Sequence, residues 1–402
     1  MVEKLQTFFE KFLGKESLFI DKKVLQSAYI PSTIPHREIQ INQIAEVMAP
    51  ALRLERPSNL FIYGKTGTGK TLSVRYTTEQ ILEVAKSKNI PLKIFYLNCK
   101  MKKIADTEYR LIAELSRYFG KAVPATGLPT DEVYNIFFRA IDSEKQIVIL
   151  ILDEVDQLVK KAGDEIIYNL TRMNSDLKNS QISLIGISND LMFADNLDPR
   201  VKSSLTEEEL VFPPYNAIEI KDILTKRSKK AFKEGVLADG VIEKCAAYAA
   251  REHGDARRAL ELLRVAGEIS ERKGKLRVEI VDLDEAEEKI EKDRIFDAIS
   301  TQPKQFQSTL YSILIISEKS KEAIQTGDVY DLYKKICLKS GLRPLTQRRV
   351  SDIIAELDML GIINVRVISK GRYGRTREIN VSLPSDAEPK IKQKLEEGLG
   401  LK

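Results

Sequence analysis

Short apolar runs alternate with longer amphipathic stretches over the first half of the chain. Most of these runs are continuous and β-branched, without the alternation of apolar and polar positions that a half-exposed strand shows. This pattern predicts strands whose two faces are both covered by helices, and hence an α/β fold with a parallel sheet. The predicted strands are residues 60–63, 92–97, 147–152, 183–188 and 209–212.

The connection between the second and third predicted strands is unusually long. It contains about fifty residues, far more than a single crossover helix requires. The apolar spacing predicts two helices there, one over about 107–119 and one starting near Thr130. A loop at 123–129 that contains proline and glycine separates them.

The second half of the chain changes character at Pro213-Pro214, which should end the last strand and mark a hinge. Residues 216–292 are predicted to be helical, and a third unit begins near Ile299. That unit should contain three helical segments followed by two alternating strands, at 362–368 and 376–383. Apolar stripes on the helices predicted within residues 216–292 are formed by Ile218, Ile220, Ile223 and Leu224, and by Leu260, Leu262, Leu263 and Val265.

Composition excludes several classes of protein. With 402 residues, 43% hydrophobic and 31% charged, the chain should be globular and not disordered. No apolar run approaches the roughly 18 residues needed to span a bilayer, so we expect no membrane contact. Three distant cysteines and two histidines argue against a Cys/His metal site and favour a reducing, cytoplasmic setting.

The charge is distributed unevenly along the chain. Residues 300–402 hold 18 Lys or Arg and 12 Asp or Glu, a net charge of +6, whereas the whole chain carries +5. A near-neutral body with a basic C-terminal unit suggests that this unit contacts a polyanion. The alternative is a solvated basic surface without a ligand.

A phosphate-binding pattern follows the first predicted strand. Residues 64–71 match GxxxxGK[ST], and a helix is predicted to start directly after them. The glycines allow backbone N–H groups to surround phosphate oxygens, Lys70 would neutralise the β- and γ-phosphates, and Thr71 would bind Mg²⁺. The candidate nucleotide-binding residues are Gly64, Thr66, Gly67, Thr68, Gly69, Lys70, Thr71 and Leu72.

Two adjacent acidic residues end the third predicted strand. A buried strand would deliver Asp153 to its carboxyl end, where it could hold Mg²⁺ through water. Glu154 would then be placed to polarise an attacking water molecule. A DE pair favours hydrolysis over a simple nucleotide switch.

The segment 346–360 is predicted to be a helix with one apolar face, and a β-hairpin follows it. The expected core positions are Val350, Ile353, Ile354, Leu357 and Leu360. This order is typical of a winged helix, whose helix enters a major groove while its hairpin reaches phosphates or a minor groove. The candidate DNA-binding residues are Gln347, Arg348 and Arg349 on the helix and Lys370, Arg372, Tyr373 and Arg375 at the hairpin tip.

A winged helix that contacts protein is the alternative, and Asp352 in the middle of the exposed helix face supports it.

The phosphate loop and the DE pair resemble those of AAA+ ATPases, and further segments match that superfamily. The resemblance assigns Asn189 to sensor one, Arg200 to the arginine finger and Arg257 to sensor two. It also implies adenine-side contacts from Tyr29-Ile30-Pro31 and residues 35–38. Hinge and lid contacts would come from Tyr215 and Arg227.

Taken together, the chain resembles archaeal initiators of the origin-recognition-complex/cell-division-control type. This resemblance implies an N-terminal extension (1–28), an AAA+ base (29–214), a helical lid (215–292) and a winged helix (293–402). It implies ATP or ADP and Mg²⁺ as cofactors, with slow ATP hydrolysis. The two extra helices in the second crossover would be that family's DNA-touching insert.

The implied partners are double-stranded DNA at replication origins, the replicative helicase and other initiator copies, in the cytoplasm at the nucleoid. Two other functions fit the same motifs. One is a nucleotide-switched transcriptional regulator, and the other is a loader or remodelling subunit whose winged helix binds protein.

Overall fold

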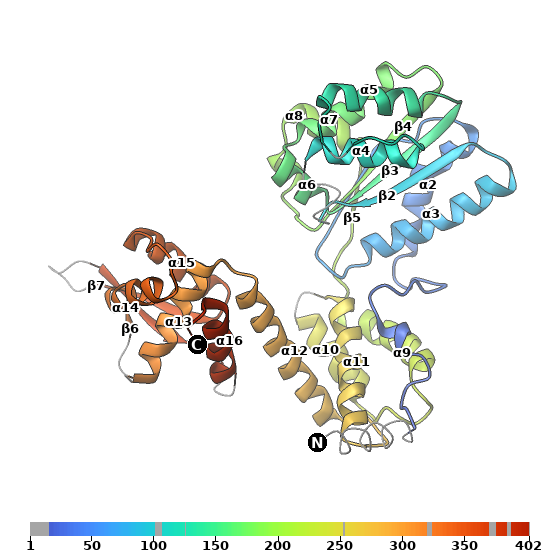
Figure 1. Ribbon diagram of the computed structural model, residues 1–402. Helices are drawn as coiled ribbons and strands as arrows, with labels where there is room; N and C mark the ends of the chain where they lie inside the picture. Colours follow the sequence, from blue (N-terminus) through green and yellow to red (C-terminus); the bar gives the residue numbers. More distant parts are fainter. Residues whose placement is uncertain are drawn as a thin grey trace, which may run out of the picture. The chain divides into compact units, whose positions relative to one another are not determined.

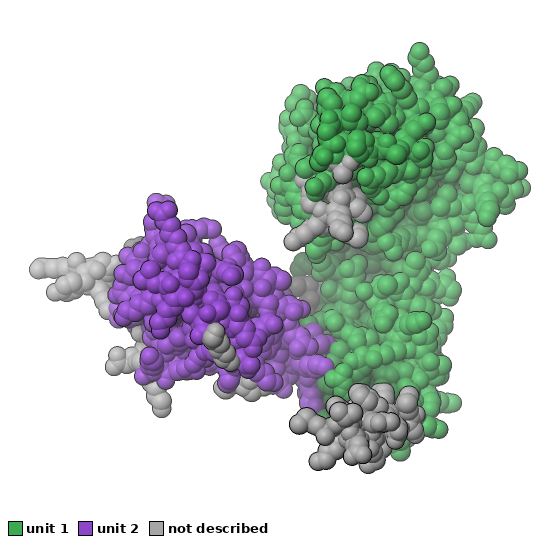
Figure 2. Space-filling view, viewed as in Figure 1, with its two compact units in different colours: residues 1–283 green, residues 284–402 purple. Residues whose placement is uncertain are grey.

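The computed structural model describes residues 16–100, 107–124, 126–251, 254–319, 324–369, 375–383 and 387–401. The chain forms two compact units, residues 1–283 and 284–402 (Figure 2). The division falls inside one long helix, α12 (Ile280–Ser300), which also contains the lid boundary expected at residue 292. Within these described ranges, no helix is long and apolar enough to cross a membrane.

The first unit is built on a five-stranded parallel sheet of order β2-β3-β4-β1-β5 (Figure 1). Each predicted strand is present in it, which confirms the α/β prediction. The bounds are β1 Leu60–Tyr63, β2 Leu92–Asn98, β3 Gln146–Asp153, β4 Ser180–Ser188 and β5 Glu208–Val211.

Helices cover both faces of this sheet, as the continuous apolar strands require (Figure 1). Alternate residues of β3 enter two separate cores, with Ile149 on one side and Leu150 on the other. One face packs against α2 (Glu38–Met48) and α3 (Lys70–Ser87). The other packs against α4 (Glu108–Tyr118), α5 (Thr130–Ile141), α6 (Val155–Ala162), α7 (Glu165–Arg172) and α8 (Pro199–Leu205).

Helices α4 and α5 are the two helices predicted in the long second crossover. Helices α6 and α7, each eight residues long, form the helical connection between the third and fourth strands, for which no separate bounds were predicted. Short 3₁₀ turns complete the first unit at Lys22–Leu25, Ala49–Arg53, Met173–Ser175 and Ala194–Asn196.

The lid consists of α9 (Ala217–Ala231), α10 (Val241–Arg251), α11 (Ala256–Arg272) and the start of α12. The α9 stripe was predicted with one error: Ile218 is 79% exposed, whereas Ile220, Ile223 and Leu224 are buried. Ile218 lies in the first turn of α9, where Asn216 and Glu219 form a capping box at the solvent edge.

Residues 16–28 contact the lid. Phe19 stacks against Phe232 with ring centroids 4.6 Å apart, and Lys233 N donates to Leu18 O at 3.0 Å. Residues 16–28 therefore run along the lid before the chain enters the base domain.

The second unit has a winged-helix fold. Its three-stranded antiparallel sheet has the order β6-β8-β7, and α16 packs against α13 through Ile391 and Leu395. Neither β6, which has two residues, nor α16 was predicted. The bounds are α13 Lys304–Lys319, β6 Ile324–Gln325, α14 Thr326–Lys339, α15 Gln347–Met359, β7 Ile363–Ser369, β8 Arg375–Val381 and α16 Glu388–Leu399.

The predicted core face of α15 is confirmed at Val350, Ile353, Ile354 and Leu357. Leu360 was wrongly placed in this core. It is 46% exposed because α15 ends at Met359, and Leu360 is the residue that caps the helix.

Candidate nucleotide site and DNA-binding helix

The loop between β1 and α3 has the backbone of a phosphate cradle. Gly67 and Gly69 adopt φ values of +70° and +92°, which residues with a Cβ rarely adopt. A Cβ on Gly67 would lie 1.7 Å from Asp255 Oδ1, and one on Gly69 would lie 2.8 Å from Tyr215 Oη. Helix α3 begins at Lys70, so the first N–H groups of its N-terminal turn face the loop.

Lys70 is almost fully buried at the centre of this loop. Its Nζ donates to Gly64 O at 2.7 Å, to Lys65 O at 2.8 Å and to Asn189 Oδ1 at 2.8 Å. Burial, together with the nearby charge of Arg257, lowers the pKa of Lys70 to about 8. A polyphosphate in the cradle would compensate both cations.

Thr71 and Asp153 meet at the candidate metal position. Thr71 Oγ1 donates to Asp153 Oδ2 at 2.8 Å, and Tyr96 Oη donates to the same carboxylate oxygen at 2.5 Å. A hydroxyl and a carboxylate side by side fit Mg²⁺, which binds few protein oxygens and completes its shell with water and phosphate. Burial, together with the adjacent Asp153 carboxylate, raises the pKa of Tyr96 and keeps it a proton donor.

The Glu154 side chain lies close to residues at the end of β2. Glu154 has a left-handed backbone (φ +55°), and Asn98 Nδ2 lies 3.5 Å from its Oε1. Lys100 Nζ lies 3.7 Å from its other oxygen.

Sequence reasoning missed Tyr96 and Asn98. Their position near the carboxyl end of β2 could have indicated that they belong to the site. In the parallel register of β2 and β3, Asn98 pairs with Asp153.

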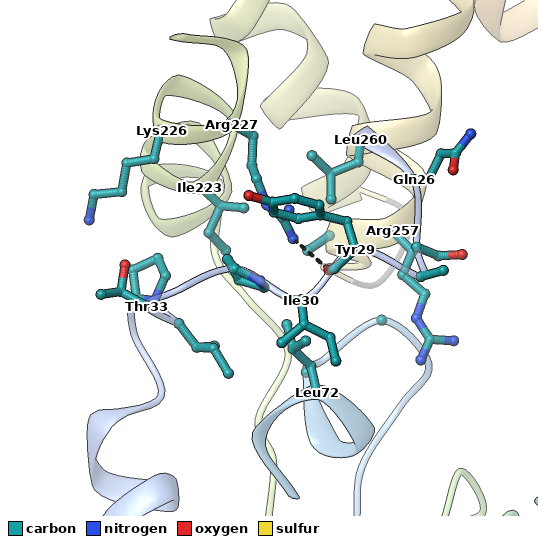
Figure 3. A pocket seen from close by; sticks show the side chains of 18 of the residues that line it. Gln26, Tyr29, Ile30, Thr33, Leu72, Ile223, Lys226, Arg227, Arg257 and Leu260 are labelled. Atoms are coloured by element: carbon teal, nitrogen blue, oxygen red, sulfur yellow. Dashed lines mark hydrogen bonds between the residues drawn. The ribbon is translucent and has the colours of Figure 1, made fainter. Parts of the chain in front are cut away.

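Two adjoining cavities lie over the loop. The larger, of about 360 Å³, lies between base and lid and is bordered by Tyr29, Ile30, Leu72, Ile223 and Leu260 (Figure 3). The smaller, of about 210 Å³, is strongly polar. An apolar chamber next to a polar one matches a nucleoside joined to its phosphates. The polar chamber is lined by Thr68, Lys70, Thr71, Asp153, Glu154, Asn189 and Arg257, among others.

The structure places most of the predicted nucleotide residues around these cavities. Ile30, Pro31, Tyr215 and Arg227 line the larger one, and Arg257 lines both. Arg227 stacks on Tyr29, 4.6 Å from the ring centroid, and donates to Tyr29 O at 3.4 Å (Figure 3). Gly64 and Thr66 are not among the lining residues, although Gly64 O holds Lys70.

Arg200 lies apart from this group. Its side chain is 73% exposed at the start of α8 and pairs with Asp198 at 3.1 Å. It also lies over the Tyr168 ring, 5.5 Å from the centroid. Arg200 lines neither cavity.

The predicted DNA-reading residues of α15 are exposed in the second unit. Gln347, Arg348 and Arg349 occupy its first turn, which Thr346 caps through a bond from Arg349 N. Arg349 also pairs with Asp352 at 3.6 Å. One contact was not predicted: Arg377 of β8 donates from Nη1 to Ser351 O in α15 at 2.7 Å.

The predicted tip residues Lys370, Arg372 and Tyr373 lie outside the described residues. Arg375 is the first residue of β8, and only its backbone is described.

The parallel sheet with its phosphate loop, the helical lid and the winged helix define an AAA+ type nucleotide-binding protein with a C-terminal winged helix. Family models agree over most of the chain. An AAA domain matches residues 53–191, a Cdc6 AAA+ ATPase-type lid domain matches 221–288, and a CDC6 C-terminal winged helix domain matches 297–388.

Full-length relatives narrow the class. The chain is 52% identical over 383 residues to an ORC1-type DNA replication protein of Thermococcus onnurineus, covering 94% of this chain and 92% of the relative. It is 50% identical over 391 residues to ORC1-type DNA replication protein 1 of Methanosarcina mazei, covering 97% and 94%. The chain belongs to the ORC1-type DNA replication protein family.

A solved structure agrees with this assignment. The Aeropyrum pernix ORC1 protein, solved in complex with DNA, superposes with a TM-score of 0.84 at 43% identity. The match covers 95% of this chain and 98% of that one.

Proposed function

We propose that this protein is an ATP-dependent initiator that binds duplex DNA at replication origins and helps recruit and load the replicative helicase. The observation that carries the proposal is the convergence of Lys70, Thr71, Asp153, Glu154 and Asn189 on one polar cavity. The same chain also presents an arginine-bearing winged helix in its second unit. The DNA complex of the related Aeropyrum pernix ORC1 supports the second half of the proposal.

In the proposed mechanism the base domain binds the nucleotide phosphates. The glycine loop and Lys70 hold the β- and γ-phosphates, while the apolar chamber takes the adenine. Thr71 and Asp153 would hold Mg²⁺, which would neutralise phosphate charge when bound. Glu154 would turn from Asn98 towards the γ-phosphate to accept a proton from water.

Three further side chains would complete the nucleotide site. Asn189, at the end of β4, would orient the water next to the γ-phosphate. Arg257 would contact that phosphate from the lid of the same chain, because it lines both cavities. Arg200 would act on the nucleotide of a neighbouring copy, which its exposed position permits.

On the DNA side, α15 would lie in the major groove with Gln347, Arg348 and Arg349 towards the bases. Lys370, Arg372, Tyr373 and Arg375 of the wing would contact phosphates or an adjacent minor groove. The α4–α5 insert of the base would supply a further DNA contact. On this proposal the protein acts on the chromosome, in the cytoplasm at the nucleoid.

Selection of genomic DNA fragments on the immobilised protein with ATP tests the proposal. Enrichment of origin-proximal repeats, together with ATP-dependent retention of the helicase on them, is the expected result. Enrichment of promoters would instead indicate a transcriptional regulator, and the absence of enriched DNA would indicate a protein-binding winged helix.

A matched pair of variants shows whether α15 reads bases. Arg348→Ala should lose about 1–3 kcal/mol of affinity on the selected site and less on random DNA. Lys390→Ala removes an exposed cation from α16 and should cost little on either DNA. Equal losses on both DNAs would make Arg348 a backbone contact.

A further inference from the structure

Arg37 is a buried cation immediately behind the phosphate loop. It is 2% exposed, and its guanidinium lies 3.7 Å from the centroid of the Tyr215 ring. Every nitrogen of the fork donates to a backbone carbonyl. Nε donates to Thr68 O at 2.8 Å, Nη1 to His36 O at 2.8 Å and Nη2 to Pro213 O at 2.6 Å.

These three carbonyls belong to three different segments of the chain, and the first of them lines the polar cavity. Thr68 lies in the phosphate loop, His36 in the predicted adenine-side segment 35–38, and Pro213 in the connection from β5 to the lid. A planar guanidinium can hold three acceptors in fixed directions, whereas the ammonium of lysine cannot reproduce that fork. Arg37 therefore fixes the phosphate loop against the hinge and the adenine-side segment.

The charge of Arg37 has no carboxylate in direct contact among the described residues. Glu219 and Glu38 act on it only at a distance, and burial lowers its pKa. A buried cation that is compensated only by carbonyl dipoles and an aromatic face is costly. Phosphates seated in the loop whose Thr68 carbonyl it holds would supply the missing negative charge.

We propose that Arg37 is a positioning residue that couples the binding of nucleotide phosphates to the closure of the phosphate loop against the lid hinge. The inference rests on the proposed nucleotide-binding function and gives a positioning role to a side chain that lines neither nucleotide cavity. The positive charge of Arg37 favours a polyanion in the phosphate loop. Its guanidinium holds the loop and Pro213 at a fixed separation, because it donates to the carbonyls of both Thr68 and Pro213.

The test compares ATP and adenosine binding by calorimetry for wild type, Arg37→Met and Arg37→Lys. Arg37→Met should bind ATP at least tenfold more weakly but adenosine within about threefold of wild type, because adenosine carries no phosphate. Arg37→Lys keeps the charge without the fork and should fall between them for ATP. It also remains informative if Arg37→Met does not fold.

Arg56→Met is the matched control. Arg56 also donates to a backbone carbonyl, Ile182 O at 3.1 Å, but it lines neither nucleotide cavity. Its ATP affinity should stay within about twofold of wild type. Unchanged ATP affinity in both Arg37 variants, or equal losses for ATP and adenosine, would overturn the inference.

Lys70→Ala distinguishes a wrong assignment of the nucleotide site from a wrong role for Arg37. If Lys70→Ala binds ATP normally, the nucleotide site itself is misassigned. If Lys70→Ala loses ATP while the Arg37 variants keep it, only the role of Arg37 fails.

Discussion

Individual buried charges are the most informative feature at the scale of single residues. Lys70 and Asp153 are each 5% exposed, and Arg37 is 2% exposed, yet none of them forms a direct ion pair with another. Such groups destabilise a fold unless something compensates them, so they concentrate at functional sites. In this protein all three surround one loop, and the two cations among them support the proposal that phosphates bind there.

The titration of Lys70 leads to a prediction about pH. Its pKa is about 8 in the folded protein and 10.5 when unperturbed. Below pH 8 Lys70 is charged in both states, so its buried charge lowers the free energy of unfolding. Between pH 8 and 10.5 it loses its proton in the folded protein only, so its contribution to the free energy of unfolding rises with pH there. ATP requires the charged form, and its affinity should therefore fall by up to about tenfold per pH unit above pH 8.

Equilibrium titrations from pH 7 to 9.5 measure this slope. Lys70→Arg is the matched control, because a guanidinium does not titrate in that range. An equal slope in Lys70→Arg would assign the pH dependence to another group.

Glu154→Gln should separate binding from hydrolysis. The substitution removes the carboxylate that would accept a proton from water but leaves Thr71 and Asp153 in place. ATP affinity should stay within about threefold of wild type while turnover falls by about 10²–10⁴, the usual contribution of a general base. Single-turnover hydrolysis provides the measurement, and turnover at the wild-type rate would exclude Glu154 from this role.

At the scale of secondary-structure elements, helix starts place the functional arginines. Asp255 caps α11 by accepting from Arg257 N at 2.8 Å, and Arg257 therefore emerges from the first turn beside Gly67. Thr346 caps α15 in the same manner, so Arg348 and Arg349 lie in its first turn. In both cases the cap sets where the helix begins and hence where the arginine points.

Arg377 joins the β7–β8 hairpin to helix α15 through its hydrogen bond to Ser351 O. The importance of this contact for DNA binding can be tested. Arg377→Met should remove the bond to Ser351 O while keeping the bulk of the side chain. Because the wing would then lose its fixed position against α15, DNA affinity should fall by about 1 kcal/mol, the value of a typical hydrogen bond.

The salt slope separates this role from a direct phosphate contact. It should stay unchanged in Arg377→Met if Arg377 only positions the wing. A slope flatter by about 0.9 would show instead that Arg377 contacts a phosphate directly.

At the scale of the whole molecule, the candidate nucleotide site and the candidate DNA-reading helix α15 lie on separate compact units. The nucleotide cavities lie entirely within residues 1–283, and the arginines of α15 lie within residues 284–402. Helix α12 belongs to both units, so it is the covalent path between the lid and the winged helix.

Arg200 allows a prediction about assemblies of several copies. An exposed arginine outside its own site should be able to complete a neighbour's site, where such a cation contributes 10³–10⁵ in related phosphoryl transfers. Lys70→Ala cannot bind ATP but can lend its arginine, whereas Arg200→Ala binds ATP but lends none. Mixing the two at concentrations where chains associate should restore hydrolysis.

The control mixes Lys70→Ala with a double variant that carries both Lys70→Ala and Arg200→Ala. This mixture should stay inactive, because neither protein in it can bind ATP. If Arg200→Ala alone turns over normally at all protein concentrations, Arg200 is a surface residue without this role.

Elements with a strong local signal could be predicted from the amino-acid sequence alone. The glycine pattern of residues 64–71 and the apolar runs predicted the phosphate loop and all five strands. Both signals are local, because a turn that needs positive φ and a strand buried on both faces restrict the residue types at those positions. The two errors, Ile218 and Leu360, lie at helix ends, where exposure depends on caps more than on periodicity.

Which distant residues share a site became known from the tertiary structure alone. Tyr96 and Asn98 join Asp153 and Glu154 because β2 pairs with β3, about fifty residues away. Arg37 reaches Thr68 and Pro213, and Arg377 reaches Ser351, through contacts that carry no periodic signal. Periodicity shows which face of an element is buried, whereas the polar partner across a long loop depends on how the elements pack.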